Sequence, residues 1–133
     1  MDTQKKYSIA IVDDDSFLLD MYSVKFTQSG FDVAMFLAAD QLLASLEGGK
    51  HYDAMILDLV MPGMDGFQLL EKIQNESLAI GAVKIVLSNL GSDDDTNRCK
   101  SFDIDGYIIK ANVTPNEVVE KVQDSLTKKY KLT

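Results

Sequence analysis

Five residues with acid, base or hydroxyl chemistry stand where short apolar runs of the chain end. They are Asp13, Asp14, Asp58, Ser88 and Lys110. If the apolar runs are parallel strands of one sheet, their carboxyl ends lie along one edge and bring these side chains into one crevice. The sequence therefore predicts a pocket with three carboxylates, one hydroxyl and one ammonium.

The three carboxylates of this pocket are expected to repel one another. Two unit charges about 4 Å apart repel by about 4 kcal/mol at an effective dielectric constant of about 20, and Lys110 offsets only part of this. A divalent cation that prefers oxygen ligands, Mg²⁺ or Mn²⁺, is expected to neutralise the rest. A cation, an ammonium and a hydroxyl beside a carboxylate are the groups needed for phosphoryl transfer, because they neutralise the charge that develops on the transferred group.

The elements that must position these side chains alternate along the chain as apolar runs and amphipathic stretches. We expect strands at 8–12, 33–36, 54–57, 84–87 and 107–109, and helices at 16–29, 39–46, 67–75, 93–102 and from 115 onward. Five such units in a row predict an α/β fold, a parallel sheet with helices on both faces. The helix at 93–102 has little apolar face, so we expect it to be the most loosely held. Thr114 and Glu117 predict a capping box for the last helix.

Length and composition limit the function. With 133 residues, no linker-like segment and 46% hydrophobic residues, the chain is expected to form one domain over 1–133, with a core at about 7–128 and no output domain. A net charge of −8 disfavours binding to nucleic acid or anionic lipid. No apolar stretch is long enough for a membrane span or signal peptide. A single cysteine, Cys99, excludes an internal disulfide and favours a cytoplasmic protein, with the thiol half-buried on a helix.

Four motifs of the chain resemble those of the response-regulator receiver domain of two-component signalling systems. They are IVDDD at 11–15, LDLVMPGMDG at 57–66, VLSN at 86–89 and GYIIK at 106–110. The resemblance covers nearly the whole chain, and LDLVMPGMDG is its most specific part. It implies a flavodoxin-like, doubly wound five-stranded parallel sheet with strand order 2-1-3-4-5.

The resemblance also implies how the acidic residues share the chemistry. Asp58 would accept a phosphoryl group from a phosphohistidine of a histidine kinase or histidine phosphotransfer protein. Asp14 would bind Mg²⁺ directly, Asp13 would bind it through water, Asp58 would be a further ligand, and the main-chain carbonyl of Val60 would complete the protein's ligands. The protein would then be a signalling switch and not a dedicated enzyme, either a monomer or a weak phosphorylation-dependent dimer, with a downstream protein target that the sequence does not name.

Three further residues would carry the switch in a protein of this family. Lys110 would pair with the phosphoryl oxygens, and Ser88 would hydrogen-bond to the phosphoryl group and move toward it. Tyr107 would then turn inward and remodel the face formed by the fourth helix, fifth strand and fifth helix, as a population shift between two packings. The alternative for Tyr107 is an ordinary half-buried strand aromatic.

The sequence departs from the family pattern at several positions. Ala111 follows Lys110 where the family usually has a proline in a cis bond, and because a cis bond before alanine costs roughly 2.5–4 kcal/mol we expect a trans bond or a rebuilt loop. Asp103 stands where glycine is common at a helix end, in a conformation that aspartate tolerates. Val60 and Leu90 are apolar where the family's side chains flank the hydrolytic water, which predicts slow self-dephosphorylation.

A phosphatase like the haloacid dehalogenases is the main competing hypothesis, and it would make the protein an enzyme. Asp13 and Asp15 would be its paired nucleophile and acid, with Ser88 and Lys110 in support. No later strand supplies the second acidic pair that such enzymes need, and LDLVMPGMDG stays unexplained. A label trapped as an acyl phosphate would map to Asp13 in this phosphatase and to Asp58 in a receiver.

A calcium-binding loop, a histidine relay and a purely partner-binding receiver have less support in the sequence. Asp93, Asp95 and Asn97 at alternate positions suggest a calcium loop, but Arg98 replaces the required glycine and no bidentate glutamate follows, so a solvated helix start is expected. His51 could be a phosphoryl relay, but in a polar loop we expect an exposed histidine. A degenerate receiver that only binds partners is favoured by the missing proline alone.

Overall fold

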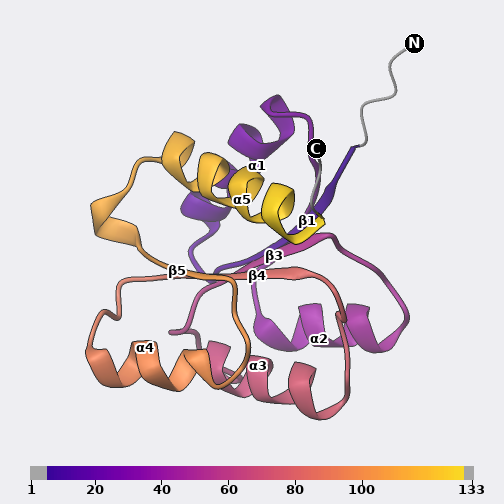
Figure 1. The fold of residues 1–133 in the computed structure, drawn as a ribbon, viewed down its shortest axis with the longest axis vertical. Coiled ribbons are helices and arrows are strands. Elements are labelled where there is room, and N and C mark those ends of the chain that lie inside the picture. The colour runs from indigo at the N-terminus through magenta and orange to yellow at the C-terminus, as the bar shows by residue number, and fades with distance from the viewer. Residues whose placement is uncertain (1–5, 131–133) are drawn as a thin grey trace.

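The computed structural model describes residues 6–130, which form a five-stranded parallel sheet between two layers of helices (Figure 1). The strands are β1 (Ser8–Val12), β2 (Asp32–Phe36), β3 (Ala54–Leu57), β4 (Val83–Ser88) and β5 (Gly106–Ile109). Their order is β2-β1-β3-β4-β5. The predicted flavodoxin-like strand order is thus confirmed.

The helices divide between the two faces of the sheet, as Figure 1 shows, with α1 and α5 on one face and α2, α3 and α4 on the other. Their bounds are α1 (Ser16–Gln28), α2 (Ala39–Glu47), α3 (Gly66–Asn75), α4 (Asp93–Lys100) and α5 (Pro115–Tyr130), with a 3₁₀ turn, η1, at Lys110–Asn112. No helix within residues 6–130 is long and apolar enough to cross a membrane.

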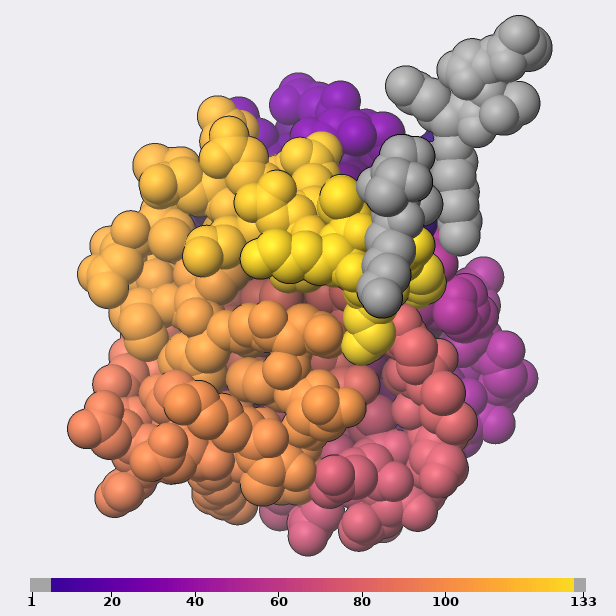
Figure 2. All heavy atoms as spheres, viewed as in Figure 1, coloured from indigo at the N-terminus to yellow at the C-terminus, as the bar shows by residue number. Residues whose placement is uncertain are grey.

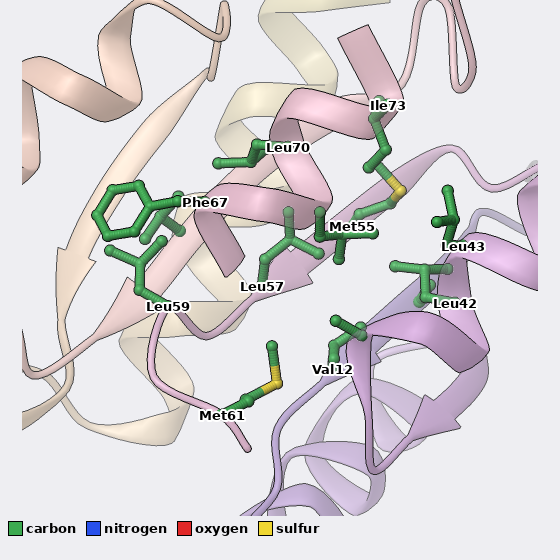
Figure 3. Packing of buried hydrophobic residues seen from close by; sticks show 14 of the residues in the cluster. Val12, Leu42, Leu43, Met55, Leu57, Leu59, Met61, Phe67, Leu70 and Ile73 are labelled. Atoms are coloured by element: carbon green, nitrogen blue, oxygen red, sulfur yellow. The ribbon is translucent and has the colours of Figure 1, made fainter. Parts of the chain in front are cut away.

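Alternate residues of the strands build two separate cores. Ile9 and Ile11 of β1 face the layer of α1 and α5, whereas Ala10 and Val12 face α2 and α3. Figure 3 shows the second of these clusters, with β-strand side chains packed beneath α3. Because both faces are covered, the central strands are apolar at nearly every position, which is why they read as continuous apolar runs in the sequence.

Side-chain caps fix where several helices begin. Asp15 accepts hydrogen bonds from two N–H groups of the first turn of α1. Thr114 and Glu117 form the predicted capping box at α5, with N···O distances of 2.7 and 3.2 Å. A second capping box, between Asp65 and Gln68 at α3, was not predicted. Each cap satisfies N–H groups that have no partner inside the helix.

The structure corrects two expectations for the segment around α4. The helix ends at Lys100 and not at position 102, because the chain turns there and Asp103 takes a left-handed φ of 57°, as its replacement of a family glycine predicts. Phe102 then packs against the core. Cys99 is fully buried instead of half-buried, and this burial raises the pKa of its thiol to about 11. Such a thiol is unreactive at neutral pH.

Candidate functional site

The register of the parallel ladders brings the predicted residues to one edge of the sheet. Val12 pairs with Leu57, and the N–H of Asp58 donates to the carbonyl of Val12 at 3.1 Å, so Asp13 and Asp58 leave neighbouring strands at the same level. Ser88 is the last residue of β4, and not the first residue after it as predicted, and it pairs with the last residue of β5. Lys110 follows directly and begins η1.

Lys110 bridges two of the carboxylates. Its Nζ lies 2.7 Å from Oδ2 of Asp13 and 3.0 Å from Oδ2 of Asp58. The exposed fractions of the three side chains are 12%, 4% and 8% for Lys110, Asp13 and Asp58. One ammonium therefore holds two nearly buried carboxylates together, as the crowding of charge at this edge predicts.

Burial sets the direction of the pKa shift of Asp13 but is outweighed by pairing for the pKa of Lys110. Burial raises the pKa of Asp13, and it outweighs the hydrogen bonds from Lys110 and from the N–H of Asp15, which favour the charged carboxylate. For Lys110, burial disfavours the ammonium, but hydrogen bonds to Asp13 and Asp58 and their negative charges prevail and raise its pKa. Lys110 is therefore charged at neutral pH, whereas burial favours the neutral form of Asp13.

The third acid completes a set of oxygen ligands suited to a small divalent cation. One carboxylate oxygen each from Asp13, Asp14 and Asp58 lie within 4.8 Å of one another. Opposite oxygen ligands of Mg²⁺ are about 4.2 Å apart, so small side-chain adjustments suffice to fit the ion. Asp14 is exposed while the other two are buried, which leaves the site open to water on one side. The chemistry and spacing of these residues fit Mg²⁺ or Mn²⁺.

Val60 stands beside this cluster. Its N–H donates to Oδ1 of Asp58 at 3.4 Å, and its side chain is among the exposed large hydrophobic ones. The metal-binding role of its carbonyl stays a prediction. An N–H of the β1–α1 loop also contacts the cluster, since Asp15 donates to Oδ1 of Asp13 at 2.9 Å. The sequence reasoning missed this contact, although a run of aspartates followed by serine is typical of such turns.

Ser88 and Tyr107 are linked through one residue of the loop before α4. Oγ of Ser88, which is buried, accepts a hydrogen bond from the N–H of Leu90 at 3.3 Å. The hydroxyl of half-buried Tyr107 donates to the carbonyl of Leu90, and burial raises the tyrosine pKa to about 12. The two predicted switch residues thus both form hydrogen bonds to the main chain of Leu90.

The loop after Lys110 differs from the family pattern as expected. Among the described residues no peptide bond is cis, so the bond before Ala111 is trans. The chain makes a 3₁₀ turn over Lys110–Asn112 before α5 begins.

The remaining candidate residues do not join the pocket. Oδ1 of Asp15 caps α1 and so does not act as the second acid of a phosphatase. Asp93 and Asp95 lie in the first turn of α4, as expected for a solvated helix start. The side chain of His51, 65% exposed, contacts Asp53 at 3.3 Å just before β3, at the opposite edge of the sheet.

Comparison with known sequences agrees with this site. The sequence pattern of the response regulator receiver domain matches residues 9–123. The regulatory protein VanRc of Enterococcus gallinarum is 30% identical over 118 residues, which cover 89% of this chain and 49% of that protein. The response regulator SaeR of Staphylococcus aureus (strain USA300) is 25% identical over 124 residues, 92% of this chain and 52% of that protein. The chain spans about half the length of these curated relatives.

Solved structures share the fold over nearly the whole chain. A CheY-like response regulator receiver domain protein from Methanospirillum hungatei JF-1 superposes with a TM-score of 0.87 at 28% identity, covering 96% of this chain and 98% of that one. The receiver domain of the Francisella response regulator 1452 has a TM-score of 0.82 at 24% identity, covering 92% and 98%, and shows the same fold. With the family pattern matched from residue 9 to residue 123, this chain belongs to the response regulator receiver domains of two-component systems.

Proposed function

We propose that this protein is a switch in which Asp58 accepts a phosphoryl group from a phosphohistidine, on a histidine kinase or a histidine phosphotransfer protein. The observation that carries the proposal is the contact set of Asp58: a buried carboxylate paired with Lys110 at 3.0 Å and clustered with two further acids. A lysine that bridges two buried acids beside a third acid supplies the charges that phosphoryl transfer uses, namely an ammonium for the phosphoryl oxygens and oxygen ligands for a divalent cation.

In the transfer step, a carboxylate oxygen of Asp58 attacks phosphorus as the P–N bond to the donor imidazole breaks, and the imidazole keeps the electron pair. Lys110 has its ammonium at the acceptor already, so it can stabilise the phosphoryl oxygens with little movement. Asp13, Asp14 and the carbonyl of Val60 would hold Mg²⁺, which supplies charge neutralisation for the transferred group. No residue is needed as a general base, because a carboxylate nucleophile has no proton to lose when it attacks.

The signal would leave the site through Ser88 and Tyr107. A phosphoryl group on Asp58 is a charged acceptor for the hydroxyl of Ser88, and a hydrogen bond to it is stronger than the neutral one that Ser88 now accepts from the N–H of Leu90. Loss of that bond frees the loop that Tyr107 also contacts. The surface from α4 through β5 to α5 would change with it, and Figure 2 shows these segments, orange to yellow, side by side on one face. We propose that a downstream protein recognises this face.

The class of this protein follows from the same arrangement. It would assist its own phosphorylation and a slow dephosphorylation without being a dedicated enzyme, because the apolar side chains of Val60 and Leu90 cannot orient water. We propose a cytoplasmic protein that is a monomer or a weak dimer formed on phosphorylation.

Incubation with acetyl phosphate and Mg²⁺, followed by intact mass and peptide mapping, tests the proposal. The wild-type protein should gain about 80 Da, the mass of one phosphoryl group, on the peptide that contains Asp58. Asp58→Asn should gain nothing, and Asp20→Asn, at an exposed position in α1, should behave like wild type. EDTA should suppress the labelling. A label on Asp13, or a label that survives in Asp58→Asn, would overturn the assignment and favour the phosphatase hypothesis.

A further inference from the structure

Helix α4 contributes little to either core. Of its eight residues only Cys99 is buried, and three aspartates fill its first turn. This confirms that the helix has almost no apolar face, and little hydrophobic burial therefore fixes its position. Contacts outside the core must hold it in place.

One such contact joins α4 to α3. The guanidinium carbon of Arg98 lies 4.0 Å from the centroid of the Phe67 ring, a distance typical of a cation–π interaction. Phe67 is itself only 6% exposed, and Figure 3 shows its ring at one end of the labelled cluster. Gln74 adds a second link between these helices, donating through Nε2 to the carbonyl of Ser101 at 3.2 Å. Both links lie near the C-terminal end of α4.

The partner helix α3 is fixed rigidly to the phosphoacceptor strand. The N–H of Gly66, the first residue of α3, donates to the carbonyl of Leu59 at 3.0 Å. A Cβ atom at Gly66 would lie only 2.8 Å from Cα of Leu59 and closer still to the carbonyl oxygen of Asp58, so the first turn of α3 packs directly on the end of β3. Phe67, the next residue, therefore keeps a fixed position relative to Asp58.

The other end of α4 is tied to the switch residues. Leu90 is held by Ser88 and Tyr107, and Ser92 caps the helix by accepting from the N–H of Asp95. Arg98 lies six residues beyond this cap, about 9 Å along the helix axis. The helix is thus held at one end through Ser88 and Tyr107, the switch residues of the proposed function, and at the other by Arg98.

We propose that Arg98 is a positioning residue of the switch: its guanidinium on the Phe67 ring anchors α4 to α3 in the unphosphorylated packing, and this contact is released on activation. The inference rests on the proposed function. When Ser88 turns to the phosphoryl group, the loop before α4 is freed, but the helix moves as a unit only if Arg98 leaves Phe67. The contact therefore opposes activation.

This role has an equilibrium consequence. A ligand that stabilises the activated packing binds more tightly when a contact present only in the other packing is removed. For a cation–π contact at an exposed arginine, the expected change is about two- to fivefold. The probe is beryllofluoride with Mg²⁺, a mimic of the phosphoryl group on aspartate, titrated by the change in a fluorescence or NMR signal.

Matched variants isolate the contact. Arg98→Met keeps an apolar stem and loses the guanidinium, and should lower the Kd for beryllofluoride about two- to fivefold. Arg98→Lys keeps the charge without the planar group, and its Kd for beryllofluoride should lie between those of Arg98→Met and wild type. Lys100→Met removes another cation of the same helical turn and should leave the Kd unchanged. Phe67→Leu should also lower the Kd for beryllofluoride, and the double variant Arg98→Met, Phe67→Leu should lower it no further than Arg98→Met alone.

The single cysteine gives a second readout that needs no phosphoryl chemistry. Cys99 is the buried residue of α4, so its reaction with a chromogenic disulfide reagent reports how often the helix moves away from the core. In metal-free buffer, Arg98→Met should raise the labelling rate about two- to fivefold and Lys100→Met should not.

The outcomes separate the two proposals. If wild-type protein does not bind beryllofluoride, the proposed function fails and the inference fails with it. If wild type binds but Arg98→Met binds equally or more weakly, Arg98 is at most a structural residue and the inference alone is overturned. An unchanged rate of Cys99 labelling in Arg98→Met overturns it as well.

Discussion

Replacing Lys110 with methionine removes the ammonium that holds Asp13 and Asp58 together while keeping most of the side chain's volume. At 2.7 and 3.0 Å, the two lost attractions are about 6 and 5.5 kcal/mol in gross Coulomb energy at an effective dielectric constant of about 20. The two carboxylates, whose nearest ligand oxygens lie within 4.8 Å of each other, then repel by at least about 3.5 kcal/mol.

Much of the lost attraction is offset, because the ammonium no longer has to be desolvated. Breaking a buried pair by removing one partner typically costs about 3–5 kcal/mol, and we expect a loss of this size in the free energy of unfolding at pH 7 in EDTA. Mg²⁺ should replace part of the missing charge, restoring about 2.7 kcal/mol at a concentration 100 times its Kd.

Urea unfolding followed by circular dichroism measures both effects. The control is Lys129→Met, which breaks the more exposed pair with Asp105 (3.4 Å) and should cost no more than about 1 kcal/mol, with no response to Mg²⁺. If Lys110→Met is as stable as wild type in EDTA, or gains no more stability than wild type at the same Mg²⁺ concentration, the electrostatic account of the pocket is wrong.

Three further perturbations test separate parts of the structure. Burial raises the pKa of Asp13 above 3.8, so neutral Asp13 contributes stability below that pH, and this contribution is lost as the pH rises through the raised pKa. In metal-free buffer, Asp13→Asn should remove this part of the pH dependence of the unfolding free energy. The double variant Val60→Asn, Leu90→Glu should shorten the half-life of the phosphoprotein in Mg²⁺ roughly tenfold by orienting water, whereas alanine at both positions should not. Gly66→Ala places a Cβ atom against the main chain of Asp58 and Leu59 and should lower the unfolding free energy by about 1–3 kcal/mol, and an unchanged urea midpoint would contradict this.

The topology and the gathering of the candidate residues at one edge of the sheet could be predicted from the sequence because both depend on the strands. A strand covered on both faces is apolar along its whole length, so β1 and β3 stand out as short apolar runs. In a parallel sheet the hydrogen-bonded register then places the next residue of each strand at the same edge, which is why Asp13 and Asp58 could be paired from the sequence. The caps at Asp15 and Thr114 were equally readable, since their signals are local.

What could not be predicted depends on single contacts between distant segments. Nothing periodic in α4 indicates that Cys99 is fully buried or that Arg98 lies on Phe67, because each is one side chain meeting one partner from another helix. The hydrogen bonds of Ser88 and Tyr107 to Leu90 could not be predicted either, since they use the main chain of Leu90 and do not depend on its side-chain type. Propensity and pattern describe elements, whereas such contacts are fixed only once the elements have been packed.

The position of Lys110 illustrates how far the sheet alone determines the site. The absence of proline at Ala111 raised the question of whether the lysine could still reach Asp58. Lys110 comes immediately after the residue of β5 that pairs with Ser88, so its main chain is placed by the ladder between β4 and β5 and not by the loop that follows. The 3₁₀ turn over Lys110–Asn112 only has to lead the chain away toward α5. The loop can therefore vary in length and composition while Nζ still contacts both carboxylates, and a change of residue at position 111 does not by itself mark this receiver as degenerate.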